Sequence, residues 1–200
     1  MESPVTVCLF GHSYIRRFDE FMRDNRDQYG NLGFDNRDVS VYCVGVGGAT
    51  VRPGAKCIVD YVHEALARTP DIMYLHVGEN DFRSSCHHPS VTVSDICSLV
   101  DRLSPPVRLT YVSQLLSFTA AAEKKNAIVE VNQSLEAHYR NADTVKVWRH
   151  RGGFWNVSGK PGKSLFDVHG VHLSDEGYTV YWHSVRVAVT KGIHRLRSSN

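Results

Sequence analysis

A serine stands near the start of the chain, where one sequence pattern gives way to another. The apolar run Val5–Phe10 stops at Gly11-His12-Ser13, and apolar residues then recur at helical spacing over Tyr14–Asn25. Ser13 is therefore expected at the N-terminus of a helix, where free backbone N–H groups and the helix dipole stabilise a developing anion. That environment suits a nucleophile, although a serine that only caps the helix is the structural alternative.

The elements that must position Ser13 follow from the rest of the pattern. Short β-rich runs are each followed by a segment with helical spacing. The runs are Val5–Phe10, Val39–Val44, Ile72–His76, Arg108–Gln114 and Val145–Trp148. The helical segments are Tyr14–Asn25, Cys57–Arg68, Val93–Leu103, Glu123–Tyr139 and Ser174–Gly192, with Ser174 as an N-cap. This alternation predicts an α/β fold, a three-layer α/β/α sandwich around a parallel sheet.

Residues that follow the strands become the candidates for a site, because ligands of such sheets bind outside the carboxyl ends of the strands. Strand one ends at Gly11-His12-Ser13, strand two runs into Gly45–Thr50, and strand three runs into His76–Asp81. A long loop before the last helix ends in Phe166–Ser174. The sheet is expected to bring these segments to one edge, where Asp81 is interpreted as a residue that holds a turn.

In this order and on these elements, the four segments resemble the four blocks of the SGNH hydrolases, also called GDSL esterases and lipases. The resemblance covers about residues 5 to 190. It implies a flavodoxin-like, five-stranded parallel sheet within a single domain over residues 1–200. It also implies a serine esterase that needs no cofactor and cleaves a small acyl ester of a lipid, a sugar or another alcohol.

The resemblance assigns roles to particular residues. Ser13 matches the nucleophile, and its backbone N–H matches the first oxyanion donor. Gly48 matches the second donor through its N–H, Asn80 the third through its side-chain amide, and His172 the general base. Ester cleavage asks for these types, because serine needs a base to take its proton and each fixed oxyanion donor contributes roughly 3–4 kcal/mol.

Two residues depart from the family pattern. His12 stands where the family usually has the aspartate of Gly-Asp-Ser, and His169 stands where an aspartate three residues before the histidine orients the base. Three groups could orient His172 instead: Asp167, a backbone carbonyl, or His169 itself. A second function follows from this departure, namely a binding module that keeps the fold but has lost hydrolysis. Domains with a similar Gly-His-Ser opening also resemble accessory domains of some retroelement-encoded proteins.

The composition and short motifs of the chain limit the partners that we expect it to bind. The formal net charge of +2 gives little support to nucleic-acid binding, and no stretch approaches the ~20 apolar residues of a membrane-spanning helix. The N-terminus lacks the layout of a signal peptide, so an intracellular, cytoplasmic protein with reduced cysteines is expected. Cys86-His87-His88 lacks a second pair of ligands at a familiar spacing, so no metal site is predicted. The sequence does not indicate the oligomeric state.

Overall fold

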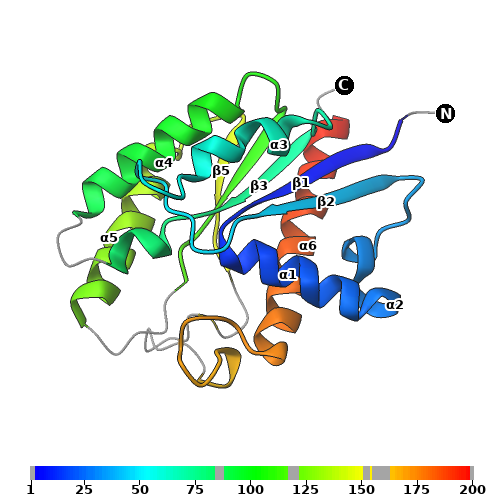
Figure 1. Cartoon of the computed structure of the whole chain (residues 1–200). Coiled ribbons are helices and arrows are strands. Elements are labelled where there is room, and N and C mark those ends of the chain that lie inside the picture. The colour runs from blue at the N-terminus through cyan, green and yellow to red at the C-terminus, as the bar shows by residue number, and fades with distance from the viewer. Residues whose placement is uncertain (1–2, 84–87, 117–121, 151–153, 155–162, 199–200) are drawn as a thin grey trace.

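The computed structural model describes residues 3–83, 88–116, 122–150, 154 and 163–198. Its centre is a parallel sheet with the strand order β2-β1-β3-β4-β5 (Figure 1). The strands are β1 Val5–Gly11, β2 Val39–Gly45, β3 Ile72–His76, β4 Leu109–Ser113 and β5 Val145–Trp148. All four pairings are parallel, which confirms the predicted flavodoxin-like sheet.

Helices cover both faces of this sheet, as the alternating pattern predicts (Figure 1). One face carries α1, α2 and α6, and the other carries α3, α4 and α5. Their bounds are α1 Ser13–Asp24, α2 Arg26–Tyr29, α3 Val62–Leu66, α4 Pro89–Leu103, α5 Ala122–His138 and α6 Asp175–Ser198. Single 3-10 turns lie at η1 Gly30–Gly33, η2 Ile58–Tyr61, η3 Glu79–Arg83 and η4 Lys163–Leu165. Among the described residues, no helix is long and apolar enough to cross a bilayer.

The sheet separates two apolar clusters. Leu9 and Tyr74 face the α1 and α6 side, whereas Phe10 and Met73 face the α4 and α5 side. All four side chains are fully buried. Central strands that are apolar on both faces are typical of a covered parallel sheet. The two clusters therefore hold β1 and β3, and with them the residues that follow these strands.

Three helices differ from their predicted bounds by more than one residue. The segment predicted as one helix over Cys57–Arg68 forms η2 and the short α3, because β-branched residues in its first turns disfavour a regular α-helix. Helix α4 begins at Pro89 rather than Val93, since proline suits a first turn and His88 caps it. Helix α6 continues past Gly192, which lies against Ile72 and Tyr111 where the helix packs closely on the sheet.

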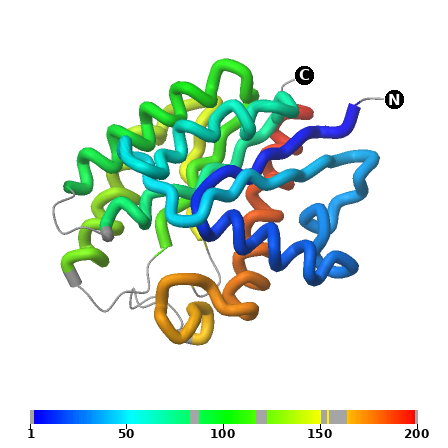
Figure 2. Tube along the Cα trace, in the orientation of Figure 1, coloured from blue at the N-terminus to red at the C-terminus, as the bar shows by residue number. Residues whose placement is uncertain are grey.

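The end of β1 lies against β3 with no space for a side chain. A Cβ on Gly11 would lie 2.1 Å from the carbonyl oxygen of His76. The His12 N–H donates to that same carbonyl, at 3.2 Å. Glycine at position 11 therefore lets the chain turn into α1 directly beside the end of β3. In the Cα trace of Figure 2, β1 runs into α1, which lies beneath the sheet in this view.

We expect Gly11→Ala to destabilise the fold by ~2 kcal/mol or more, because the added methyl group overlaps a backbone carbonyl that cannot move aside. Urea unfolding measures the loss. Gly54→Ala is the matched control, since a Cβ on Gly54 meets no atom within 4 Å. Equal stabilities of the two variants would contradict this account of the β1–β3 contact.

Candidate active site

The serine and the histidine predicted to act together are in contact. Ser13 opens α1, and its Oγ lies 3.2 Å from Nε2 of His172. That distance allows the hydroxyl to donate to the imidazole. Ser13 is buried and His172 is partly buried, so the pair is largely shielded from bulk water.

The loop before α6 is tied down at several points, and this positions His172. Residues Phe166 and Leu173 form an antiparallel bridge, and the Asp167 N–H donates to the His172 carbonyl at 2.8 Å. The Ser174 hydroxyl accepts from the Gly177 N–H at 3.1 Å, which confirms Ser174 as the N-cap of α6. The Tyr14 hydroxyl donates to the Val171 carbonyl at 3.1 Å and so joins this loop to α1.

Asp167 faces the other nitrogen of His172. Its Oδ2 lies 3.6 Å from His172 Nδ1, an ion-pair distance that is longer than a hydrogen bond. Partial burial opposes ionisation of this carboxyl. The backbone N–H groups of Val171 and His172 outweigh that effect and hold the pKa of Asp167 below its usual value. The side chain of His169 is exposed instead. Of the two side chains considered for orienting the base, Asp167 lies beside it and His169 is at the surface.

The two further oxyanion candidates lie on neighbouring loops. Gly48 has a φ of +77°, a conformation that favours glycine, and a Cβ there would meet no atom within 4 Å. Asn80 donates from its amide nitrogen to the carbonyl of Ala49, at 2.8 Å. This bond fixes Asn80 beside the Gly48 loop. Because an amide nitrogen carries two hydrogens, a second N–H remains for an oxyanion.

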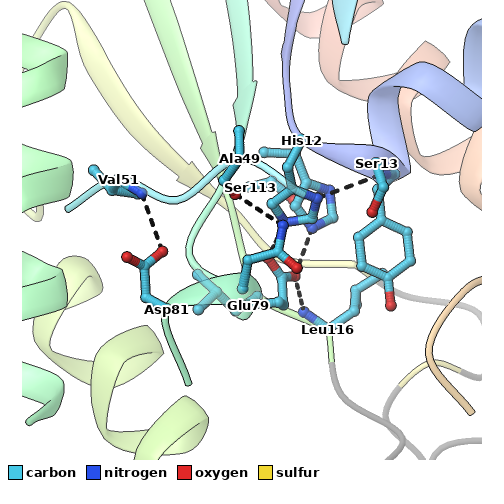
Figure 3. A network of polar contacts seen from close by, with 12 residues as sticks. His12, Ser13, Ala49, Val51, Glu79, Asp81, Ser113 and Leu116 are labelled. Atoms are coloured by element: carbon cyan, nitrogen blue, oxygen red, sulfur yellow. Dashed lines mark hydrogen bonds and ion pairs between the residues drawn. The ribbon is translucent and has the colours of Figure 1, made fainter. Parts of the chain in front are cut away.

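Asp81 holds the loop that follows β2, whereas the sequence predicts only that it holds a turn. Its carboxylate is fully buried and accepts from the backbone N–H groups of Val51 and Arg52, each at 3.1 Å (Figure 3). These bonds cross from the end of β3 to the loop after β2. Asp81 therefore fixes the Gly48 segment relative to Asn80.

A buried cluster around Glu79 lies beside these residues, and sequence reasoning missed it. One carboxylate oxygen of Glu79 lies 2.6 Å from His12 Nε2. The other lies 2.7 Å from His76 Nε2 and accepts the Leu116 N–H at 2.8 Å (Figure 3). The sequence signal was a histidine at the end of an otherwise apolar strand and a glutamate three residues later. No local pattern indicated that His12 is their partner.

Burial and the neighbouring groups determine the protonation states of Glu79 and His76. Burial opposes ionisation of Glu79, yet the imidazoles of His76 and His12 hold its pKa well below the usual range. Burial lowers the pKa of His76 despite the nearby carboxylate. We therefore assign an ionised Glu79 that accepts from the neutral imidazole of His76 and from Nε2 of His12.

These three residues are also the group in the described chain that best matches a set of metal ligands, with donor atoms within 4.8 Å of one another. His12 Nδ1 accepts the Tyr14 N–H at 3.3 Å, which leaves the proton on Nε2, the atom that a metal would need. The cluster is thus satisfied by hydrogen bonds among its members and from the N–H groups of Tyr14 and Leu116. Of Cys86-His87-His88, the metal candidates weighed from the sequence, Cys86 and His87 lie outside the described residues and His88 caps α4.

The five-stranded parallel α/β fold matches solved structures of GDSL hydrolases. A family model described as GDSL-like lipase/acylhydrolase matches residues 10–184, so the chain belongs to this family.

Solved structures give the same fold at low sequence identity. A GDSL-like lipase from Bacteroides thetaiotaomicron is 18% identical, with a TM-score of 0.71 over 96% of this chain and 92% of its own. A lipase/acylhydrolase from Enterococcus faecalis is 13% identical, with a TM-score of 0.69 over 92% of this chain and 95% of its own. A comparison with curated proteins gives no significant match.

We expect Asp81→Ala to lower the free energy of unfolding by ~2–4 kcal/mol, because two backbone N–H groups lose their buried acceptor. Denaturant unfolding measures this loss. Asp24→Ala removes an exposed carboxylate at the end of α1, and its effect should stay within about 0.5 kcal/mol. A loss for Asp81→Ala as small as that of the control would show that Asp81 does not hold the loop.

Proposed function

We propose that the protein is a serine esterase in which Ser13 attacks the carbonyl carbon of a small acyl ester. The observation that carries the proposal is the contact between Ser13 Oγ and His172 Nε2 at the N-terminus of α1. Membership of the GDSL-like lipase/acylhydrolase family supports the same reaction class.

The reaction follows from this geometry. His172 takes the Ser13 hydroxyl proton on Nε2 as Oγ bonds to the carbonyl carbon. The backbone N–H groups of Ser13 and Gly48 and the amide of Asn80 stabilise the oxyanion that forms. When the ester C–O bond breaks, His172 gives its proton to the departing alkoxide and the acyl group stays on Ser13. A water molecule, deprotonated by His172, then releases the carboxylic acid and restores the serine.

Asp167 is the residue that we propose orients His172 and stabilises its cation. Its carboxylate is the negative charge that the structure brings to His172 Nδ1, and the backbone donors around it keep it ionised. The substitution of His169 for the family's usual aspartate is then compatible with catalysis, because an acid from the same loop takes over the role.

We expect the wild-type protein to turn over short-chain nitrophenyl esters. Ser13→Ala and His172→Ala should each lower kcat/KM by at least about 10³, since nucleophile and base act as one unit. The wild-type rate should rise from about pH 5 to about pH 8 as the base loses its proton. Folded wild-type protein without any ester turnover, or equal turnover by Ser13→Ala, would contradict the proposal. The first of these results would favour the binding module.

The role of Asp167 is tested by comparing Asp167→Asn with His169→Ala. We expect kcat to fall by about 10- to 100-fold in Asp167→Asn, less than in a triad whose acid is buried and hydrogen-bonded, because Asp167 is partly exposed and 3.6 Å from the ring. His169→Ala should retain the wild-type kcat. Steady-state kinetics on the same ester measures both. A loss confined to His169→Ala would assign the orienting role to His169 instead.

A further inference from the structure

We propose that His12 and Glu79 form a matched donor and acceptor pair that positions the nucleophile Ser13 relative to the oxyanion donor Asn80. Ser13 follows His12 in the chain and Asn80 follows Glu79, so the 2.6 Å contact between the two side chains joins the backbones that carry both groups. The inference rests on the proposed esterase function. His12 and Glu79 act as positioning residues through their neighbours.

The pair has little freedom to move. His12 is 1% exposed and Glu79 is 8% exposed. His12 also caps α1, because its Nδ1 accepts the Tyr14 N–H, and its own N–H donates to the His76 carbonyl. Glu79 is held on its other side by His76 and by the Leu116 N–H. Each of the two side chains is thus held at the end of a different strand by contacts other than the one between them.

The direction of the hydrogen bond is determined by the cap. Because His12 Nδ1 accepts from Tyr14, His12 Nε2 carries the proton and must donate. Position 79 must then provide an acceptor, and the ionised carboxylate of Glu79 is one. A carboxylate at position 12 would instead face the carboxylate of Glu79 in a buried site, which is strongly unfavourable. The histidine that departs from the family's Gly-Asp-Ser is therefore the residue that suits Glu79.

Misalignment of this pair should affect kcat more than KM. The oxyanion donors contact charge that develops in the transition state, so a shift between Ser13 and Asn80 weakens transition-state binding and leaves ground-state binding largely intact. Misplacement by about 1 Å is enough to lower a rate by about 100-fold.

The test compares isosteric variants that differ in donor and acceptor character. His12→Gln retains an amide N–H that can reach Glu79, and kcat should stay within about fivefold of wild type. His12→Glu places two carboxylates together, and Glu79→Gln places an amide N–H against the His12 N–H. Each should lower kcat by about 50-fold or more, with KM changed by less than about threefold.

The double variant His12→Glu/Glu79→Gln restores a match in the opposite direction. The amide introduced at position 79 can donate to the new carboxylate while its oxygen still accepts from His76 and Leu116, and the carboxylate at position 12 can cap α1. We expect kcat within about tenfold of wild type. Thermal unfolding of each variant establishes that the comparison is made on folded protein. Equal kcat for His12→Glu and His12→Gln, or a folded double variant without recovery, would overturn the inference.

Nuclear magnetic resonance of protein with ¹⁵N-labelled histidine separates this inference from the proposed function. We expect His12 as the Nε2–H tautomer, with a downfield proton signal that shifts in Glu79→Gln. That result supports the pair even if the wild type cleaves no ester, which would overturn only the proposed function. A His12 ring protonated on Nδ1 alone would overturn the pair whatever the activity.

Discussion

The carboxylate of Glu79 joins the ends of three neighbouring strands, and the geometry of the candidate site depends on these hydrogen bonds. It accepts from His12 after β1, from His76 at the end of β3 and from the Leu116 N–H after β4. A buried carboxylate without these donors would be costly, so the three segments are held where all of them reach it. This arrangement therefore sets the positions of Ser13, which follows His12, and of Asn80, which follows Glu79.

The loop before α6 holds Asp167 beside His172. The segment between Asp167 and Val171 turns back on itself, since the Gly170 N–H donates to the Asp167 carbonyl and the Val171 N–H to the Asp167 carboxylate. The turn returns the acid to the imidazole and leaves His169 at the surface. The turn therefore places Asp167, the residue that we propose orients His172, beside the ring, although His169 is nearer to His172 in the chain.

Much of the fold could be predicted because its signals are local. The strands are apolar runs, and the parallel topology brings their carboxyl ends to one edge, so the contact between Ser13 and His172 follows from pattern and resemblance. The cluster of His12, His76 and Glu79 could not be predicted, because hydrogen bonds between residues 67 positions apart leave no periodic signal. The division of Cys57–Arg68 into two short elements was likewise missed, because its helical spacing hides the β-branched residues that disfavour a regular helix in its first turns.

Activation of Ser13 by His172 is the step on which the proposed chemistry depends. Labelling with a fluorophosphonate tests it most directly, because the probe reacts with an activated serine whatever ester the protein prefers, and peptide mass spectrometry locates the adduct. We expect a single adduct on Ser13 in the wild type and none in Ser13→Ala or His172→Ala. Folded wild-type protein that takes up no label, or an adduct that forms equally fast in His172→Ala, would contradict this activation.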